Sequence, residues 1–248
     1  MLLFDPVILL VLTTGYLSGS IVKGISGFGA LLIAVPVMTL VVEPATAIAL
    51  TSGPVFVSNL WQLFETRNAG WAIKRLWPYL AILIPAAFVG SQFLAHLDPR
   101  TSSAVIGGIV IAFSVLQIFP INIKITPQRQ KAAGILASLF GGLIGGATII
   151  AGSIMVMYLF SLKMNKDRFV SSIALVFLCN SIPVYLTLTY YGRYTVEELI
   201  VSVGLVLPAL GGLVLGRLLR EHVSHHLFQK IVVFLLLIIG LVLLARAL

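Results

Sequence analysis

The stretch GYLSGSIVKGISGFGALLIAVP, residues 15–36, decides how the chain folds. It is apolar almost throughout, yet it contains one cation, Lys23, and four glycines interrupt its interior: Gly19, Gly24, Gly27 and Gly29. Glycine in a helix interior costs roughly 1 kcal/mol relative to alanine and allows the backbone to leave helical geometry. In lipid, such a break persists only where protein or a water-filled cavity covers the exposed backbone groups. The stretch therefore predicts a broken membrane helix and is the first candidate for a functional site.

Composition defines the class of protein. The chain has 248 residues, of which 59% are hydrophobic and only 10% are charged, and its mean hydropathy is +1.10. A soluble domain of this length has about 25% charged residues. Apolar runs long enough to cross a hydrocarbon layer of ~30 Å recur from one end of the chain to the other. The sequence therefore predicts an all-α polytopic membrane protein.

The charged residues and the single cysteine exclude several other classes. The sequence pI is about 9.9, and the basic residues lie in short connectors, as the positive-inside rule describes for membrane proteins. They do not form the continuous basic patch that binds the phosphate backbone of a nucleic acid. We therefore expect no nucleic-acid partner. Cys179 is alone in an apolar segment, so neither a disulfide framework nor a cysteine metal site is expected. The first apolar run has no basic leader before it, so we expect no cleaved signal peptide.

The apolar segments fall into two halves of similar plan, with about eight segments in all. In each half a broken segment comes first and three transmembrane helices follow. The first half covers residues 1–121, with its broken segment at 7–42 and helices near 44–64, 76–94 and 101–119. A polar linker at 122–130 leads to the second half, 131–248, with its broken segment at 132–161 and helices near 169–190, 195–219 and 227–244.

The two halves align when one is moved along the other by 121 or 122 positions. The glycine break at Gly24 then falls on the break at Gly146, and Asn59 falls on Asn180. Pro36, which follows the first break, falls on Tyr158. The identity is thin, and the charges provide an independent test of the repeat.

The placement of basic residues favours an inverted repeat. If neither broken segment makes a net crossing, twelve basic residues share one membrane face and three lie on the other, with Lys23 set aside. If each broken segment crosses once, the same residues divide seven against eight. The positive-inside rule favours the first arrangement, which inverts one half relative to the other and places both termini outside the cytoplasm. The twelve residues are Arg67, Lys74, Arg75, Lys124, Arg129, Lys131, Lys163, Lys166, Arg168, Arg217, Arg220 and Lys230.

Inverted repeats with interrupted helices at matching positions are typical of secondary transporters. Charge parity leaves open whether the broken segments are re-entrant or cross fully. The arms of the second break, residues 132–143 and 149–161, are short for a full span. We therefore favour V-shaped segments that penetrate part of the bilayer.

The sequence also resembles a known family. GISGFGALLIAVP at residues 24–36, its weaker counterpart GGLIGGATIIAG at 141–152, the size and the eight apolar segments are similar to the sulfite exporter TauE/SafE family. The resemblance covers essentially the whole chain. It implies eight transmembrane segments in two inverted halves and transport of sulfur-containing anions such as sulfite or organosulfonates. Many relatives carry a denser glycine run and a proline in the second half, where this chain has Tyr158.

Such an anion needs hydrogen-bond donors in a site shielded from lipid, such as helix N-termini, hydroxyls, amides and a cation. The candidate substrate-binding residues are Lys23, Gly24, Ser26, Gly27, Phe28, Gly29, Asn59, Gly146, Thr148 and Asn180. Each has a structural alternative. The glycines can serve tight helix packing, the asparagines can bond between helices, and Lys23 can be a boundary lysine that reaches the cytoplasmic surface.

The carboxylates constrain the mechanism, because all eight fall at segment ends or in connectors. Importers coupled to protons or sodium usually keep a carboxylate within the membrane, whereas an anion leaving a cell that is negative inside needs none. We therefore expect a secondary transporter of the prokaryotic inner membrane that exports a small sulfur-containing anion through a midplane site at the two helix breaks.

An anion channel of the same architecture is the alternative. An intramembrane enzyme lacks support, because the sequence has no HExxH motif, no pair of buried aspartates and no Ser/His pair at membrane depth. We expect no cofactor and no metal. We interpret the adjacent His225 and His226 as part of a solvent-exposed face and not as a metal site. The expected partners are the small anion and the lipid bilayer, and the sequence is compatible with a homodimer.

Overall fold

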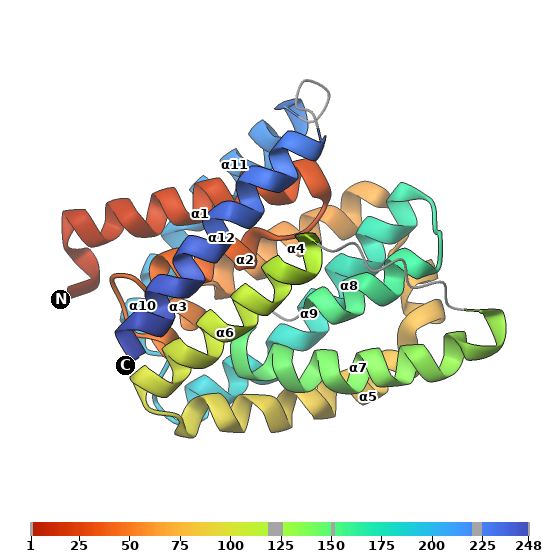
Figure 1. The fold of residues 1–248 in the computed structure, drawn as a ribbon, viewed down its shortest axis with the longest axis horizontal. Coiled ribbons are helices and arrows are strands. Elements are labelled where there is room, and N and C mark those ends of the chain that lie inside the picture. The colour runs from red at the N-terminus through yellow and green to blue at the C-terminus, as the bar shows by residue number, and fades with distance from the viewer. Residues whose placement is uncertain (1, 119–125, 150–151, 220–224, 248) are drawn as a thin grey trace. The chain divides into compact units, whose positions relative to one another are not determined.

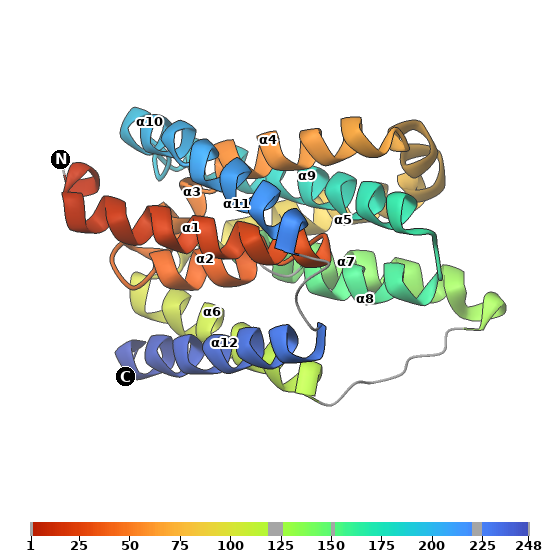
Figure 2. The ribbon, with the colours of Figure 1, turned by 90° about the horizontal axis from the view of Figure 1, so that it is seen from above.

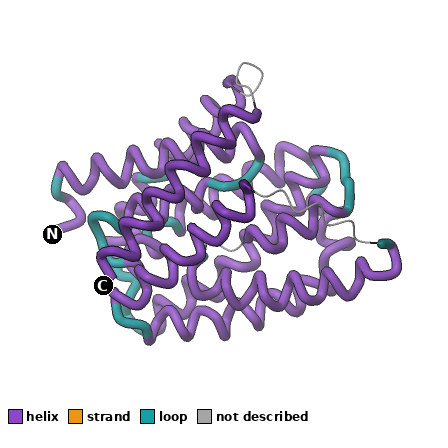
Figure 3. The backbone as a smooth tube through the Cα atoms, in the orientation of Figure 1, coloured by secondary structure: helices purple, strands orange, loops and turns teal. Residues whose placement is uncertain are grey.

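The computed structural model describes residues 2–118, 126–149, 152–219 and 225–247. Helices joined by short loops account for these residues, and no strand occurs among them (Figure 3). The chain divides into two compact units that alternate along the sequence. Unit 1 comprises Met1–Pro54, Leu97–Ile121 and Thr195–Leu248, and unit 2 comprises Val55–His96 and Asn122–Tyr194. Each unit therefore takes helices from both halves of the predicted repeat.

We number the four segments of each half in chain order, with the broken segment as the first. Unit 1 contains the first segment of the first half and most of the third and fourth segments of the second half (Figure 1). Asp5 begins its first long helix, because the carboxylate accepts hydrogen bonds from the backbone N–H groups of Val7 and Ile8 at 2.8 and 3.2 Å. Its helices are η1 (Leu2–Phe4), α1 (Pro6–Ser26), α2 (Ala30–Met38), α3 (Pro44–Ala49), α6 (Pro99–Ile118), α10 (Val196–Gly204), α11 (Val206–Leu219) and α12 (His225–Ala247).

Unit 2 contains the second broken segment. Its helices are α4 (Ser52–Thr66), whose first three residues are counted with unit 1, α5 (Ala69–His96), η2 (Pro127–Arg129), α7 (Gln130–Thr148), α8 (Gly152–Ser161) and α9 (Lys166–Tyr190). The helices α5, α7 and α9 pack together, and α8 lies beside α7 (Figure 2). The first four residues of the predicted linker, 122–125, lie outside the described residues.

Two helices that the sequence predicted as continuous are interrupted. The predicted helix at 44–64 divides into α3 and α4 at a turn over Leu50 and Thr51, and the predicted helix at 195–219 divides into α10 and α11 at Leu205. A proline follows each interruption, Pro54 in one case and Pro208 in the other. Proline lacks the N–H that would bond four residues back, and its ring clashes with that carbonyl. At these two positions the helix is interrupted in the preceding turn, whereas α5 and α9 continue through Pro78, Pro85 and Pro183.

Within unit 1, α1 and α11 approach so closely that only glycine fits between them. A methyl group placed on Gly24 would lie 2.4 Å from the carbonyl oxygen of Leu213, and one on Gly216 would lie 2.2 Å from the carbonyl oxygen of Ile21. Gly212 meets the backbone of Leu17 in the same way, at 2.5 Å. Small residues four apart are the usual means by which membrane helices bring their backbones together.

Unit 2 repeats this interface between α7 and α5. A methyl group on Gly146 would lie 2.1 Å from the carbonyl oxygen of Ala87, and one on Gly90 would lie 2.0 Å from that of Leu143. Gly146 follows Gly24 by 122 positions, and Leu143 follows Ile21 by the same 122. The first helix of each half therefore packs on the third helix of the other half, through equivalent backbone atoms.

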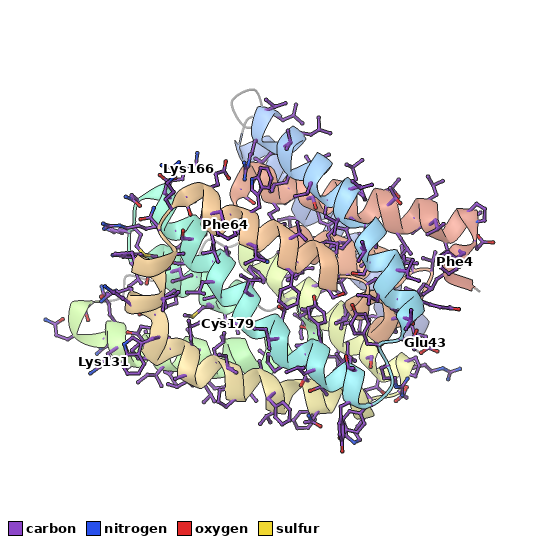
Figure 4. The ribbon with its side chains drawn as sticks, turned by 180° about the vertical axis from the view of Figure 1, so that it is seen from behind. Phe4, Glu43, Phe64, Lys131, Lys166 and Cys179 are labelled. Atoms are coloured by element: carbon purple, nitrogen blue, oxygen red, sulfur yellow. The ribbon has the colours of Figure 1, made fainter. Side chains whose placement is uncertain are left out.

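The ends of α4, α5, α7, α8 and α9 define one basic end of unit 2. Tyr158 near the end of α8 contacts Gly134 near the start of α7, and the Thr66 hydroxyl at the end of α4 bonds to the Ser171 hydroxyl in α9. Figure 4 shows Lys131 and Lys166 at this end, with Cys179 midway along α9. The basic residues here are Arg67, Lys74, Arg75, Arg129, Lys131, Lys163, Lys166 and Arg168, and the acidic ones are Glu65 and Asp167.

The close approach of α1 and α11 predicts opposite effects for two neighbouring glycines. Gly212→Ala adds a methyl group against the Leu17 carbonyl, so the helices must separate, which we expect to destabilise the protein by ~1–3 kcal/mol. Gly211 faces open space on the same helix, and Gly211→Ala should leave stability unchanged or raise it by up to ~1 kcal/mol through helix propensity. Thermal unfolding in detergent measures the difference, and equal melting temperatures for the two variants would contradict this interface.

Candidate functional site

The first break is a helical hairpin made by α1 and α2. The two helices run side by side in opposite directions, because Gly19 on α1 meets Ala30 and Ala34 on α2 while Gly15 meets Val37 (Figures 1 and 2). α1 ends at Ser26, as the glycine-rich stretch predicted. Gly27 caps it in the left-handed region, at φ 90°, and donates its N–H to the Lys23 carbonyl at 2.7 Å.

The hairpin tip satisfies much of its own hydrogen bonding. Gly29 has φ 99° and begins α2. The Ser26 hydroxyl lies 2.8 Å from the Val22 carbonyl oxygen and 2.7 Å from the Phe28 carbonyl oxygen, and it accepts a long bond from the Phe28 N–H. The N–H of Gly27 and the hydroxyl of Ser26 therefore maintain the turn, whereas the sequence interpretation directed them toward an anion.

Lys23 is buried one turn before the tip. Its side chain is only 6% exposed, and Arg217 on α11 lies close enough for the two positive charges to repel each other. The sequence interpretation placed Arg217 in a cytoplasmic connector and did not connect it with Lys23. The structure places both cations in unit 1 where the tip of the first hairpin meets the end of α11. The two basic side chains make the tip of the first hairpin a candidate position for an anion.

The second break resembles the first in its backbone. α7 ends at Thr148, and Ile149 caps it in the left-handed region at φ 56°, donating its N–H to the Gly145 carbonyl at 2.7 Å. The Thr148 hydroxyl is buried and bonds to the carbonyl of Ile144 in its own helix at 2.9 Å. α8 then returns beside α7, with Met155 against Gly141, so this segment is also a hairpin. Residues 150 and 151 at its tip lie outside the described residues.

Two of the candidate glycines have a clear packing role. Gly24 is covered by the backbone of α11, and Gly146 is covered by the backbone of α5. The atoms that would meet a methyl group at either position belong to the protein backbone. The structural alternative of tight helix packing therefore describes Gly24 and Gly146, whereas Gly27 and Gly29 shape the turn.

The two aligned asparagines lie in different surroundings within unit 2. The Asn59 amide donates to the Val55 carbonyl of its own helix at 2.8 Å. Asn180 on α9 is 2% exposed, and its amide lies against Gly145 on α7. Neither the oxygen nor the nitrogen of the Asn180 amide has a hydrogen-bond partner. A buried amide without partners is rare in folded proteins and requires an explanation.

The described residues contain no group of three or more His, Cys, Asp or Glu side chains that could hold a metal ion. Among these residues, five helical stretches are long and apolar enough to span a bilayer: Pro6–Ser26, Ala69–His96, Gln130–Thr148, Lys166–Tyr190 and Val196–Leu219. Repeated apolar helices, two hairpins whose first helices end in left-handed caps, and a buried lysine define an integral membrane protein of the transporter type.

Comparison with known families identifies the group of transporters. The model of the sulfite exporter TauE/SafE family matches residues 11–243, nearly the whole chain. The chain belongs to the sulfite exporter TauE/SafE family. It is therefore a membrane transporter of sulfur-containing anions and not an enzyme. No curated protein and no solved structure shows a significant match to the chain. That the protein forms a homodimer is a prediction that these comparisons do not test.

The left-handed backbone at the first tip predicts a specific requirement for glycine. Gly29→Ala places a Cβ atom in a conformation that costs L-residues about 1–2 kcal/mol, so we expect lower thermal stability and slower transport. Gly108→Ala on α6 adds its methyl group in open space and should preserve both properties. Thermal unfolding and vesicle transport of both variants measure the effect. A Gly29→Ala protein as stable as Gly108→Ala would show that the tip tolerates side chains.

Proposed function

We propose that this protein exports a small sulfur-containing anion of the sulfite or sulfonate class across the prokaryotic inner membrane, as a secondary transporter. The observation that carries the proposal is the family match over residues 11–243. The geometry supports it with a buried lysine at the tip of a broken-helix hairpin, which is where transporters commonly bind their substrates. Lys23 supplies the counter-charge for the anion, with Arg217 beside it.

Membrane potential provides the driving force for export. Moving one negative charge out of a cell that is negative inside releases ~2.3 kcal/mol per 100 mV. The carboxylates of the described residues lie at helix ends and in connectors, so no acidic relay is needed for this direction. Exporting an anion down its electrical gradient therefore requires only a shielded site and alternating access to the two sides.

We further propose eight spans in two inverted repeats. If the halves are inverted, equivalent helices that pack on each other must run in opposite directions. In unit 1, the fourth helices of the halves pack with Gly107 of α6 near Leu244 of α12 and Ile111 near Gly240, which is an antiparallel register. In unit 2, the second helices meet with Thr66 of α4 at Ser171 of α9 and Phe56 at Tyr185, again antiparallel. Both registers support the inversion.

The charges then suggest from which side each hairpin enters. In unit 2, the open end of the α7–α8 hairpin lies among the basic residues, whereas in unit 1 the tip of the α1–α2 hairpin lies beside Arg217. Because the positive-inside rule assigns both basic regions to the cytoplasm, the first hairpin enters from outside and the second from inside. Both chain termini then lie outside the cytoplasm.

This topology predicts different labelling at two exposed glutamates. In a Cys179→Ser background, Glu197→Cys should react with a membrane-impermeant thiol reagent in intact cells, and Glu65→Cys should react only after lysis. Neither change removes a basic residue that determines topology. Labelling at position 65 but not at position 197 in intact cells would overturn the proposed orientation.

The transport proposal is tested in proteoliposomes loaded with radiolabelled sulfite. We expect saturable efflux that accelerates when unlabelled sulfite is present outside, because counter-exchange distinguishes a carrier from a channel. Lys23→Met should reduce the apparent affinity for sulfite at least tenfold, since truncating one partner of a shielded charge pair typically costs ~2–5 kcal/mol. Lys23→Arg should retain part of the affinity because it keeps the positive charge.

Lys74→Met is the matched control, because Lys74 is an exposed basic residue in unit 2, and we expect wild-type transport from it. Wild-type protein that moves no sulfur-containing anion would contradict the proposed function. A Lys23→Met variant with wild-type affinity would contradict only the role of Lys23.

A further inference from the structure

The proposed function assigns no role to Asn180, whose buried side-chain amide has no hydrogen-bond partner. The side chain is 2% exposed, yet its donor and its acceptor both lack partners. Leaving a buried polar group unsatisfied normally costs the full desolvation of that group. Such a group requires an explanation, and a bound ion is one of the explanations that buried unsatisfied groups in native proteins have.

The surrounding helices hold this amide at the second break. A methyl group on Gly145 would lie 2.5 Å from the Asn180 oxygen and 2.8 Å from its nitrogen, so only glycine leaves room for the amide. The Gly145 carbonyl is the one that accepts the capping N–H of Ile149. Asn180 therefore lies within one helical turn of the point at which α7 ends.

The corresponding place in the first break is occupied by a cation. Gly145 follows Lys23 by 122 positions, the same offset that relates Gly146 to Gly24. The carbonyl of each residue accepts the N–H of the left-handed cap, from Gly27 in the first half and from Ile149 in the second. The second break thus offers a neutral amide from α9 where the first offers a lysine from α1.

The interior around Asn180 is uncharged. The described residues of α5 beyond Arg75, of α7 beyond Lys131, of α8, and of α9 beyond Arg168 include no Asp, Glu, Lys or Arg. The energetic cost of burying an ion grows steeply with its charge, so dipoles alone hold a singly charged anion far more readily than a doubly charged one. Unit 2 is therefore suited to a monoanion.

The amide also specifies the hydrogen-bonding character of its ligand. Its nitrogen only donates, and its oxygen only accepts. A ligand that satisfies both must carry an oxygen acceptor and a hydroxyl or similar donor close together. Hydrogen sulfite, the singly charged form of sulfite, carries both, whereas a simple alkanesulfonate carries acceptors only.

We propose that Asn180 contacts the substrate at the second break and selects hydrogen sulfite, the protonated monoanion, over doubly charged sulfite and over alkanesulfonates. Its Nδ2–H group donates to an oxygen on sulfur, and its Oδ1 accepts the O–H of the ligand. This assignment rests on the proposed function, since it names the ionic form that the transporter carries.

The test compares Asn180→Leu with Ser181→Ala in proteoliposomes. Leucine keeps the branched shape and the number of heavy atoms of the side chain but removes both hydrogen bonds. We expect hydrogen sulfite efflux to fall at least tenfold and methanesulfonate efflux to fall less. Ser181 is the neighbouring residue, and its hydroxyl bonds to the Leu178 carbonyl of its own helix at 2.9 Å. Ser181→Ala should therefore transport like wild type.

Thermal unfolding without substrate separates a binding role from a structural one. Because no protein group bonds to the amide, Asn180→Leu removes no hydrogen bond within the protein and should melt at the same temperature as wild type or higher. A lower melting temperature together with lost transport would identify a structural residue and overturn the proposal. Efflux by Asn180→Leu equal to wild type would overturn it as well.

The pH dependence tests the ionic form. At constant total sulfite, wild-type efflux should rise as the pH is lowered and the fraction of hydrogen sulfite increases. Efflux that follows the doubly charged form would overturn the selection of the monoanion. Wild-type protein that carries other sulfur-containing anions but not sulfite would leave the transporter class intact and overturn the Asn180 proposal, whereas inactivity toward all of them would contradict the proposed function itself.

Discussion

The close contact between helix backbones is the constraint on which the rest of this structure depends. A helix that ends inside a membrane exposes backbone groups that lipid cannot satisfy. Here α1 and α7 each end in a left-handed cap, and each is held by a partner helix at a distance that only glycine permits. Without Gly24 against α11 and Gly146 against α5, the broken ends would lose the protein cover that makes them tolerable.

The position of the first break could be predicted from the sequence, because α1 ends at Ser26 within the predicted glycine-rich stretch. The second prediction was less accurate: the first arm was expected to end at residue 143, but α7 continues through the glycine run and ends at Thr148. The role of each glycine could not be predicted. Gly24 and Gly27 are three residues apart, yet one packs against Leu213 and the other forms the cap. The packing partner is distant in sequence, and no local pattern identifies it.

Electrostatic and hydrogen-bonding partners were harder still to predict. Arg217 belongs to a basic connector by composition, and only the parallel packing of α11 on α1 brings it to Lys23. Asn180 was a candidate because it aligns with Asn59, but its unsatisfied amide follows from its contact with Gly145 across two helices. The interruptions before Pro54 and Pro208 could not be predicted from proline alone, because Pro78, Pro85 and Pro183 lie inside continuous helices.

The alternation of the two units along the chain has a consequence for biosynthesis. Unit 2 is complete once the chain reaches Tyr194, whereas unit 1 waits for helices at the very end. Until α11 is made, α1 must stay in the bilayer with its glycine face and Lys23 uncovered. The nascent chain therefore passes through a period in which a helix that carries a lysine at membrane depth lacks its packing partner. Cellular insertion factors have most to protect during that period.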